Sequence, residues 1–281
     1  MQASLLFLII TTLIFFALNS LLAKATLINN YSDPYSFTLL RVFFGSLVLV
    51  FLVYIKEKKV QISFKSNYIS SLMLFIYALF FSYAYISLDA GLGALILFAF
   101  VQLTIIIYSL IKKENFNLQK VLGIVMSFAG LIYLLYPDEK FELSLFHFIL
   151  MMISGIAWGV YTILGKGSLN PILNTMDNFT KATLIALVTF FIISPTLNIT
   201  ANGIILAFIS GGITSALGYA LWYYLLPQLQ TITSGLIQLL VPPIAIVLSI
   251  VFLDEELSIK LVLSTGIILL GILISMKSNK H

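Results

Sequence analysis

Long apolar stretches separated by short polar connections run along the whole chain. Ten of them are close to the ~20 residues that an α-helix needs to cross the hydrocarbon core of a bilayer. They cover residues 3–23, 34–55, 68–88, 91–111, 118–136, 144–165, 178–199, 202–226, 230–253 and 259–276. No connection is long enough to hold a soluble domain. The pattern predicts an all-α integral membrane protein with ten transmembrane helices.

The second half of the chain resembles the first half at an offset of about 141 positions. The matching positions are Phe16 to Asn19 with Trp158 to Tyr161, Phe81 to Tyr83 with Trp222 to Tyr224, Glu114 with Glu255, and Gly130 with Gly271. Chance similarity among apolar helices is the alternative, and the matched glutamates, glycines and aromatic residues favour a true repeat. Each half holds an odd number of spans, so the second half must enter the membrane in the opposite direction. We therefore expect two inverted five-helix repeats, residues 1–139 and 140–281, an arrangement typical of secondary transporters with the substrate site between the halves.

Composition agrees with a membrane protein. Charged residues make up 9% of the chain and apolar residues 60%, whereas roughly 25% of a soluble domain is charged. Such a chain has too little polar surface to cover itself. It has no cysteine, which excludes disulfides and thiolate chemistry. The net charge of +4 comes from lysines beside the apolar stretches and does not indicate nucleic-acid binding.

The first apolar stretch has an alternative interpretation as a cleaved signal peptide, because Ala23-Lys24-Ala25 resembles a cleavage site. No basic segment precedes the apolar run, however, and the run is longer than is usual for a signal peptide. The repeat also requires this stretch as the counterpart of the sixth. We therefore expect a transmembrane helix here.

The lysines predict the orientation, because cytoplasmic connections of membrane proteins are rich in Lys and Arg. With a cytoplasmic N-terminus, the inner side holds Lys56, Lys58, Lys59, Lys65, Lys112, Lys113, Lys120, Lys166, Lys277 and Lys280. The outer side then holds only Lys24, Lys140 and Lys260. We expect a multi-pass protein of the bacterial cytoplasmic (inner) membrane with both termini in the cytoplasm.

Arg41 is the single arginine of the chain and lies seven residues after Pro34 in the second stretch. A guanidinium inside a membrane span marks a functional site by default, and its planar fork suits a carboxylate or phosphate. The alternatives are an ion pair with Asp33 or Asp89, or a side chain that extends to the membrane surface. Lys181, near the start of the seventh stretch, is expected to extend to the surface in this way.

Aromatic side chains are concentrated in the segments that the two halves share. The candidate substrate contacts among them are Tyr83, Trp158, Tyr161, Trp222 and Tyr223. Trp158 and Tyr161 lie on one helix face beside a Gly-x-x-x-Gly run, which lets helices approach closely. Interfacial anchoring and helix packing are the alternatives. We expect these rings to line a substrate chamber.

Three amides lie well inside apolar stretches: Asn19, Gln102 and Gln238. An unpaired amide in hydrocarbon would cost several kcal/mol, so each bonds to another helix or faces a wet cavity. We expect Asn19 and Gln102 to face the cavity, and we include Gln238 among the candidate substrate contacts. Pro242-Pro243 interrupts the ninth stretch; interrupted helices point to transporter binding sites, and a static kink is the alternative.

The acidic residues all lie at or near the ends of the predicted spans, Asp177 included. The sequence therefore shows no clear mid-membrane carboxylate to relay protons. The chain has no phosphate-binding loop and no HExxH or Asp-rich cluster, which argues against ATP drive and against a metalloenzyme. We predict no catalytic residue, no metal site, no cofactor and no enzyme activity.

The most specific part of the sequence lies between Ala216 and Ile274. It holds Tyr219-Ala220-Leu221-Trp222-Tyr223-Tyr224, then Pro242-Pro243, then Leu253-Asp254-Glu255-Glu256-Leu257-Ser258, then Gly266 and Gly271. The first half contributes Asn19, Lys24, Arg41, Glu114, Gly123 and Gly130. With these features the chain resembles the drug/metabolite transporter superfamily, specifically its EamA-type members. It departs from them in Phe16-Ala17 in place of Trp-Gly, in a fourth stretch without proline, and in Ser264 where the first half has Gly123.

The resemblance implies alternating-access movement of small metabolites, often outward. We therefore expect a secondary transporter that moves a small organic solute, amino acid-like or an organic anion, with efflux as the expected direction and Arg41 facing the anionic group. Its expected partners are this solute and the lipid bilayer, with no nucleic acid. A lipid or lipid-linked sugar flippase of the same fold is one alternative, and a non-transporting membrane subunit is the other. Glu114 and Glu255 are expected to start helices, where a carboxylate is favourable.

Overall fold

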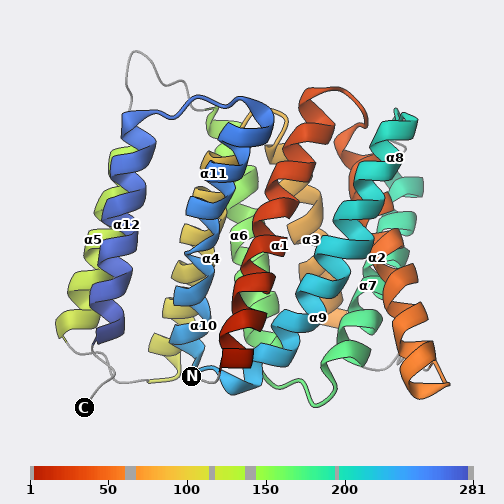
Figure 1. Cartoon of the computed structure of the whole chain (residues 1–281), viewed down its shortest axis with the longest axis horizontal. Coiled ribbons are helices and arrows are strands. Elements are labelled where there is room, and N and C mark those ends of the chain that lie inside the picture. Colours follow the sequence, from red (N-terminus) through yellow and green to blue (C-terminus); the bar gives the residue numbers. More distant parts are fainter. Residues whose placement is uncertain (1–2, 61–67, 114–117, 137–143, 194–195, 278–281) are drawn as a thin grey trace.

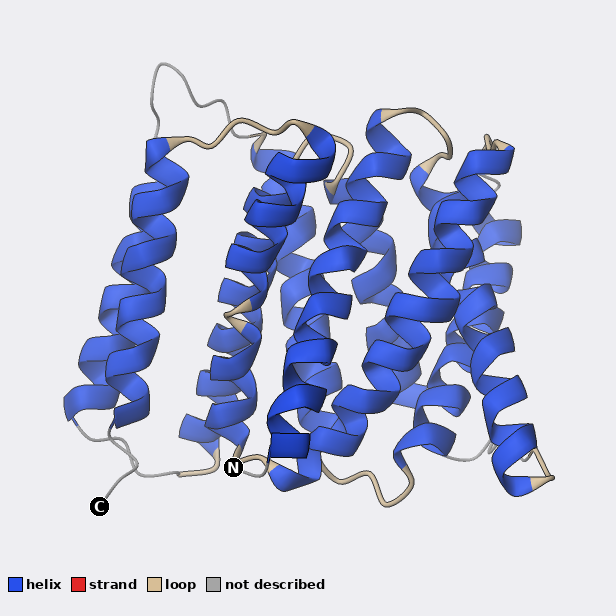
Figure 2. Ribbon diagram, viewed as in Figure 1, coloured by secondary structure: helices blue, strands red, loops and turns tan. Residues whose placement is uncertain are grey.

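The computed structural model of the chain describes residues 3–60, 68–113, 118–136, 144–193 and 196–277. Every named element in these residues is a helix: α1 (Ala3–Ile28), α2 (Pro34–Glu57), α3 (Tyr68–Ala84), α4 (Ala90–Ile111), α5 (Leu118–Leu135), α6 (Leu145–Gly165), α7 (Pro171–Ile193), α8 (Ala201–Phe208), the π-helix η1 (Ile209–Ser215), α9 (Ala216–Leu225), the 3₁₀-helix η2 (Leu226–Gln228), α10 (Thr231–Gln238), α11 (Val241–Leu253) and α12 (Ile259–Lys277). The connections gather at the two ends of the bundle, apart from the short one between α10 and α11 (Figure 2).

Seven helical segments are long and apolar enough to cross a membrane: Leu5–Ile28, Pro34–Glu57, Ala90–Ile111, Leu145–Gly165, Pro171–Ile193, Ala201–Gln228 and Thr233–Leu253. Three further apolar helices, Tyr68–Ala84, Leu118–Leu134 and Ile259–Ser275, are shorter. These segments overlap the ten apolar stretches of the sequence. The predicted multi-pass, all-helical membrane character is confirmed.

The start of α1 and the end of α12 lie at the lower end of the bundle in Figure 1. The first connection, between α1 and α2, lies at the opposite, upper end, together with the connection between α11 and α12. Three lysines of the orientation argument, Lys65, Lys140 and Lys280, lie outside the described residues, and so does Glu114.

Helix starts follow local capping chemistry. The carboxylate of Asp33 accepts the backbone N–H of Ser36 at 2.9 Å, and Pro34 occupies the first turn of α2. Both features satisfy or remove donors that a helix N-terminus leaves unpaired. Thr200 caps α8 in the same way, accepting from the N–H of Gly203 at 3.2 Å. Asp33 and Thr200 therefore set where α2 and α8 begin.

The predicted start of the seventh span is wrong. We expected this span over residues 178–199, whereas α7 runs from Pro171 to Ile193. Pro171 begins the helix, and the side chain of Asn170 accepts the N–H of Leu173 at 3.4 Å. The polar residues in the first turns of α7 lower the mean hydropathy there, so the sequence pattern indicated a loop. In the structure these residues are helical and mostly buried.

The ninth apolar stretch consists of two helices. α10 ends at Gln238 and α11 begins at Val241, with Pro242 and Pro243 in its first turn. The prolines supply no N–H to a preceding turn, which accounts for the interruption. Figure 2 shows it as a short loop at mid-height of the bundle.

Helix packing follows a matched pattern in the two halves. α6 packs on α3 and α4, while α1 packs on α9 with η1 and on α11. α2 packs against α7 across the halves, and α5 packs against α12 at one edge of the molecule (Figure 1). The α5–α12 contact is close because Gly123 faces Gly271, and a Cβ at Gly123 would lie 2.2 Å from the carbonyl oxygen of Gly271.

Candidate functional site at the centre of the bundle

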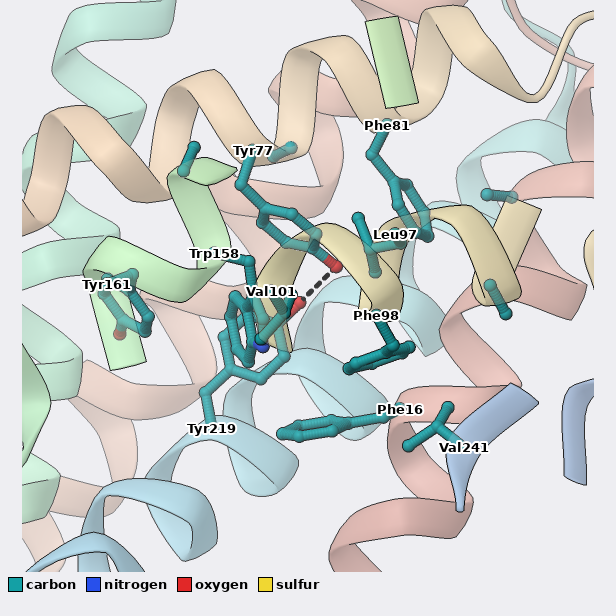
Figure 3. Close-up of a cluster of buried hydrophobic side chains, with 14 of the residues drawn as sticks. Phe16, Tyr77, Phe81, Leu97, Phe98, Val101, Trp158, Tyr161, Tyr219 and Val241 are labelled. Carbon is teal, nitrogen blue, oxygen red and sulfur yellow. Dashed lines mark hydrogen bonds between the residues drawn. The ribbon is translucent and has the colours of Figure 1, made fainter. Parts of the chain in front are cut away.

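A cluster of buried aromatic rings occupies the centre of the bundle (Figure 3). The ring of Trp158 lies 4.6 Å from that of Tyr219, 4.9 Å from that of Tyr77 and 5.3 Å from that of Phe16. These four rings come from α6, α9, α3 and α1. Aromatic pairs at such distances are worth ~0.5–1.5 kcal/mol each beyond their burial. The cluster therefore holds both halves of the chain together.

Arg41 reaches into this cluster from α2 and is 1% exposed. Its Nη2 donates to the hydroxyl of Tyr219 at 2.6 Å and to that of Tyr77 at 2.9 Å. Its Nε donates to the hydroxyl of Ser215 at 3.1 Å. The guanidinium also lies 4.9 Å from the ring centre of Phe81, a cation–π distance. Neutral hydroxyls and rings, from three helices, thus surround the charge.

No carboxylate neutralises Arg41 within the described part of the chain. The ion pairs there are Lys24 with Asp89 and Lys181 with Asp177. The expected alternatives for Arg41 are therefore contradicted, because it neither pairs with Asp33 or Asp89 nor extends to the surface. Its Nη1 is buried and has no hydrogen-bond partner among the described residues. The site combines a buried positive charge with a donor that remains unused.

Asn19 lies beside this arginine and is 1% exposed. Its Oδ1 accepts from three hydroxyls of η1, those of Ser210 at 2.9 Å, Thr214 at 2.7 Å and Ser215 at 3.1 Å. Its Nδ2 is buried without a partner among the described residues. Ser215 links the two side chains, because its hydroxyl accepts from Arg41 and donates to Asn19. Two unused donor groups therefore lie on one hydrogen-bonded network.

The π-helix η1 brings these hydroxyls close to α2. A Cβ at Gly211 would lie 2.1 Å from the carbonyl oxygen of Arg41, so only glycine allows this approach. π-helical turns are rare and frequent at functional sites.

The cavity at the aromatic cluster is nearly closed in this conformation. It has a volume of about 10 Å³ and is lined by Phe16, Ser20, Tyr77, Phe81, Leu97, Phe98, Trp158 and Tyr219. This is about the space that one water molecule needs. A larger solute requires the surrounding helices to move apart.

Four predicted site residues surround this cluster: Tyr161, Trp222, Tyr223 and Gln238. The indole N–H of Trp158 donates to Oε1 of Gln238 at 2.7 Å, and that of Trp222 donates to Thr162 at 3.3 Å. The ring of Tyr161 lies 4.9 Å from that of Tyr223. Hydrogen bonds and ring contacts connect seven of the predicted site residues to the cluster: Asn19, Arg41, Trp158, Tyr161, Trp222, Tyr223 and Gln238.

Two predicted site residues lie elsewhere. Gln102 lines a peripheral groove between α4, α5 and α12, together with Ser127 and Ile268. Its Oε1 is buried and has no partner among the described residues. Tyr83 is half-buried and does not line the central cavity.

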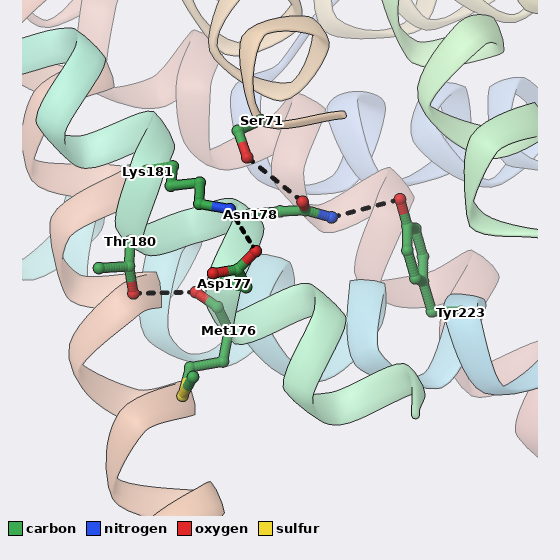
Figure 4. A network of polar contacts seen from close by, with 7 residues as sticks. All are labelled: Ser71, Met176, Asp177, Asn178, Thr180, Lys181 and Tyr223. Carbon is green, nitrogen blue, oxygen red and sulfur yellow. Dashed lines mark hydrogen bonds and ion pairs between the residues drawn. The ribbon is translucent and has the colours of Figure 1, made fainter. Parts of the chain in front are cut away.

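The prediction that Lys181 extends to the membrane surface is wrong. Lys181 is 2% exposed and its Nζ lies 2.6 Å from Oδ2 of Asp177, one turn away on α7 (Figure 4). The ammonium also lies 4.9 Å from the ring of Tyr68. Asp177 is likewise buried, seven residues into its helix, so the expectation that all carboxylates lie near span ends is contradicted.

Polar contacts close the bundle at both ends. At the upper end, Oε1 of Glu255 accepts the backbone N–H of Ala90 at 2.8 Å, and Lys24 lies 3.8 Å from Asp89. Glu255 thus caps α4, whereas Ser258 caps its own α12. Burial raises the pKa of the Glu255 carboxyl, and the bond from Ala90 opposes this shift. At the lower end, Lys166 donates to the hydroxyl of Thr231.

Sequence reasoning missed Tyr77 and Ser215 and did not give Tyr219 a role. The expected repeat offset of about 141 positions could have pointed to the tyrosines, because Tyr77 and Tyr219 are 142 positions apart. Ser215 depends on the π-helix, which no feature of the sequence pattern indicated.

Comparison with known proteins identifies relatives over nearly the whole chain. The chain is 37% identical to an uncharacterized protein of Pseudomonas aeruginosa over 267 residues, which is 95% of this chain and 92% of that protein. It is 22% identical to the uncharacterized transporter YoaV of Bacillus subtilis, covering 85% of this chain and 86% of that protein. An uncharacterized transporter of Archaeoglobus fulgidus is 24% identical, over 71% and 72% of the two chains.

A solved crystal structure shares the fold with a TM-score of 0.74 and 13% identity, covering 100% of this chain and 98% of that one. The model of the EamA-like transporter family matches twice, over residues 3–136 and over residues 145–277. The chain therefore belongs to the EamA-like transporter family.

Proposed function

We propose that this chain is a secondary transporter that moves a small organic anion or amino acid-like solute out across the cytoplasmic membrane. The buried guanidinium of Arg41, which no carboxylate of the described residues neutralises, carries the proposal. The two halves would open to the two sides in turn, around the aromatic cluster.

An anionic solute would neutralise the buried charge of Arg41. A buried charge without a counter-charge is costly, and an unpaired buried donor adds to the cost. Nη1 of Arg41 and Nδ2 of Asn19 are both donors without partners in the described residues. A carboxylate has only acceptors and one negative charge, so it would neutralise the arginine and accept from its unused donor. A bound solute of this class supplies what the protein lacks.

Contacts between repeat-related residues support two inverted halves. The hydroxyl of Tyr219 donates to that of Tyr77, 142 positions earlier, at 2.9 Å. The rings of Phe16 and Trp158, also 142 positions apart, lie 5.3 Å apart. A residue near a two-fold axis meets its own counterpart across that axis, which is the pattern seen here. The two matches of the family model, one in each half, agree with this division.

A ligand-stabilisation experiment tests the proposal. The detergent-purified protein is heated with a library of amino acids, organic anions and neutral metabolites, because a ligand that binds the native state raises its apparent stability. We expect carboxylates to raise the melting temperature. Arg41→Met, which removes the charge but keeps an apolar stem, should abolish the rise, and Arg41→Lys should retain part of it.

The matched control is Gln102→Met, which changes a buried polar side chain outside the central cluster and should leave the response intact. Stabilisation by neutral solutes alone, or a carboxylate response that a folded Arg41→Met protein retains in full, would refute the proposed anion site.

A further inference from the structure

A second cavity opens at the end of the bundle where α1 begins and α12 ends. It has a volume of about 390 Å³ and lies between α1, α2, the start of α7, and α9. Its lining residues are Phe15, Leu52, Lys56, Asn170, Pro171, Ile172, Leu217, Ala220, Leu221 and Tyr224. We call it the α1–α9 groove. Its volume lies within the ~300–1,000 Å³ typical of small-molecule sites, unlike that of the central cavity.

The groove is apolar along its length. Leu217, Ala220, Leu221 and Tyr224 follow one another at helical spacing on one face of α9, since residues three and four apart share a face. Three of these side chains are partly exposed, and that of Tyr224 is exposed. An apolar hollow of this size in a membrane protein is unfavourable for water and fits a hydrocarbon chain.

The mouth of the groove is positively charged. Lys56 lies one turn after Leu52 on the same face of α2, and Lys58 and Lys59 follow it. The nearby carboxylate of Glu57 accepts from Nδ2 of Asn170 at 3.3 Å. Lys56 forms no ion pair within the described residues. α7 begins at this mouth, and the positive end of its dipole adds to the charge.

The groove is separate from the central site. Phe15 lines the groove, whereas its neighbour Phe16 points into the aromatic cluster. Between them α1 and α9 are in contact, since a Cβ at Gly218 would lie 3.0 Å from Cβ of Phe15. A molecule in the groove therefore does not occupy the place of the transported solute.

We propose that the α1–α9 groove binds an anionic phospholipid of the surrounding leaflet, with one acyl chain along α9 and the phosphate at Lys56. A polybasic segment beside a membrane helix attracts anionic lipid, and a long lysine side chain extends along an apolar wall to reach it. This inference does not rest on the solute that the carrier moves.

Native mass spectrometry of the detergent-solubilised protein, incubated with equal amounts of phosphatidylglycerol and phosphatidylcholine, tests the inference. We expect one lipid to be retained, with phosphatidylglycerol preferred by roughly fivefold, the effect of one basic side chain at an anionic lipid surface. Ala220→Phe fills the groove and should abolish retention of both lipids.

Lys56→Gln changes an exposed side chain and should leave folding intact while removing the preference for phosphatidylglycerol. Lys112→Gln is the matched control, because Lys112 is also exposed and ends α4 at the same end of the bundle. Equal retention of the two lipids by the unmodified protein, or undiminished retention by a folded Ala220→Phe protein, would overturn the inference. Neither result would bear on the anion site at Arg41.

Discussion

Tyr219 donates its hydroxyl proton to the hydroxyl of Tyr77 at 2.9 Å, and both oxygens also accept from Nη2 of Arg41. The two tyrosines come from different halves of the chain, on α9 and α3. A single cationic nitrogen therefore joins the two halves of the chain through two tyrosine side chains that lie 142 positions apart. Any separation of α3 from α9 must lengthen at least one of these bonds.

Tyr219→Phe should destabilise the protein by about 1.5–3 kcal/mol, because hydrogen bonds to charged groups are worth that much. The substitution keeps the ring in the aromatic cluster and removes the hydroxyl that accepts from Arg41 and donates to Tyr77. Thermal unfolding in detergent measures the effect. Tyr224→Phe on the same helix, at a side chain that is 52% exposed, should change stability by less than about 0.5 kcal/mol. Equal losses of stability in the two variants would mean that the hydrogen bond from Arg41 to Tyr219 does not contribute to the stability of the fold.

The apolar pattern predicted most of the fold because hydrophobic length is what the bilayer demands. It failed at α7, where Asn174, Asp177, Asn178 and Lys181 lower the local hydropathy. Those side chains have partners on α7 itself, in the loop before it and on other helices, as in the bond from Ser71 to Oδ1 of Asn178 at 3.3 Å. Hydropathy measures the cost of a residue in lipid and contains no information about such partners.

The candidate site was predictable where single residues are costly in a membrane. Arg41 and Asn19 stand out because a charge or an amide in a span requires a reason. The direction of a side chain was not predictable in the same way, so Gln102 was expected in the cavity although it faces a peripheral groove. Tyr77 is an unremarkable aromatic in sequence, and only its place opposite Tyr219 gives it a role.

The buried pair on α7 should show strong coupling. Lys181→Met leaves the Asp177 carboxylate buried without its ammonium and should cost about 3–5 kcal/mol. Replacing both residues, as in Asp177→Leu with Lys181→Met, should be close to neutral, because an apolar pair avoids the desolvation of two charges. Thermal unfolding of the two single variants and the double variant completes the cycle. Additive losses would show that the two charges do not interact.

The contact between α5 and α12 should depend on Gly123. A Cβ there would lie 2.2 Å from a backbone oxygen, and overpacking of this kind costs about 1–3 kcal/mol. Gly266→Ala on α12 is the control, because a Cβ at that position meets nothing within 4 Å. It should be neutral or stabilising by up to about 1 kcal/mol, the difference in helix propensity. A Gly123→Ala protein that unfolds at the same temperature as the unmodified protein would contradict the close packing of α5 against α12.

The proposed orientation can be tested directly, because the chain has no cysteine. A single cysteine at Lys58, after α2, should be protected from a membrane-impermeant maleimide in intact cells. A single cysteine at Glu256, between α11 and α12, should react. Both positions are exposed, so accessibility within the fold does not explain a difference. The reverse pattern would place both termini outside the cytoplasm.

Stability should depend on pH through Glu255, whose pKa is raised by burial in the folded protein. A raised folded pKa means that the folded state holds the proton more tightly than the unfolded state, whose pKa is about 4.3. The stability contributed in this way is complete below the unfolded pKa and is lost as pH rises through the folded pKa. Glu255→Gln keeps an acceptor for the N–H of Ala90 but does not titrate.

The melting temperature of Glu255→Gln minus that of the unmodified protein should therefore increase as pH rises from about 4 and become constant above the folded pKa. Glu256→Gln is the control. The Glu256 carboxylate, next to Glu255 in the chain, is exposed, so the melting-temperature difference between this variant and the unmodified protein should not change with pH. Lys24 and Asp89 also face Glu255, and they remain in both variants, so they do not produce the difference. A difference that falls with rising pH would mean that the favourable bond to Ala90 outweighs burial, because the carboxylate would then be stabilised on folding.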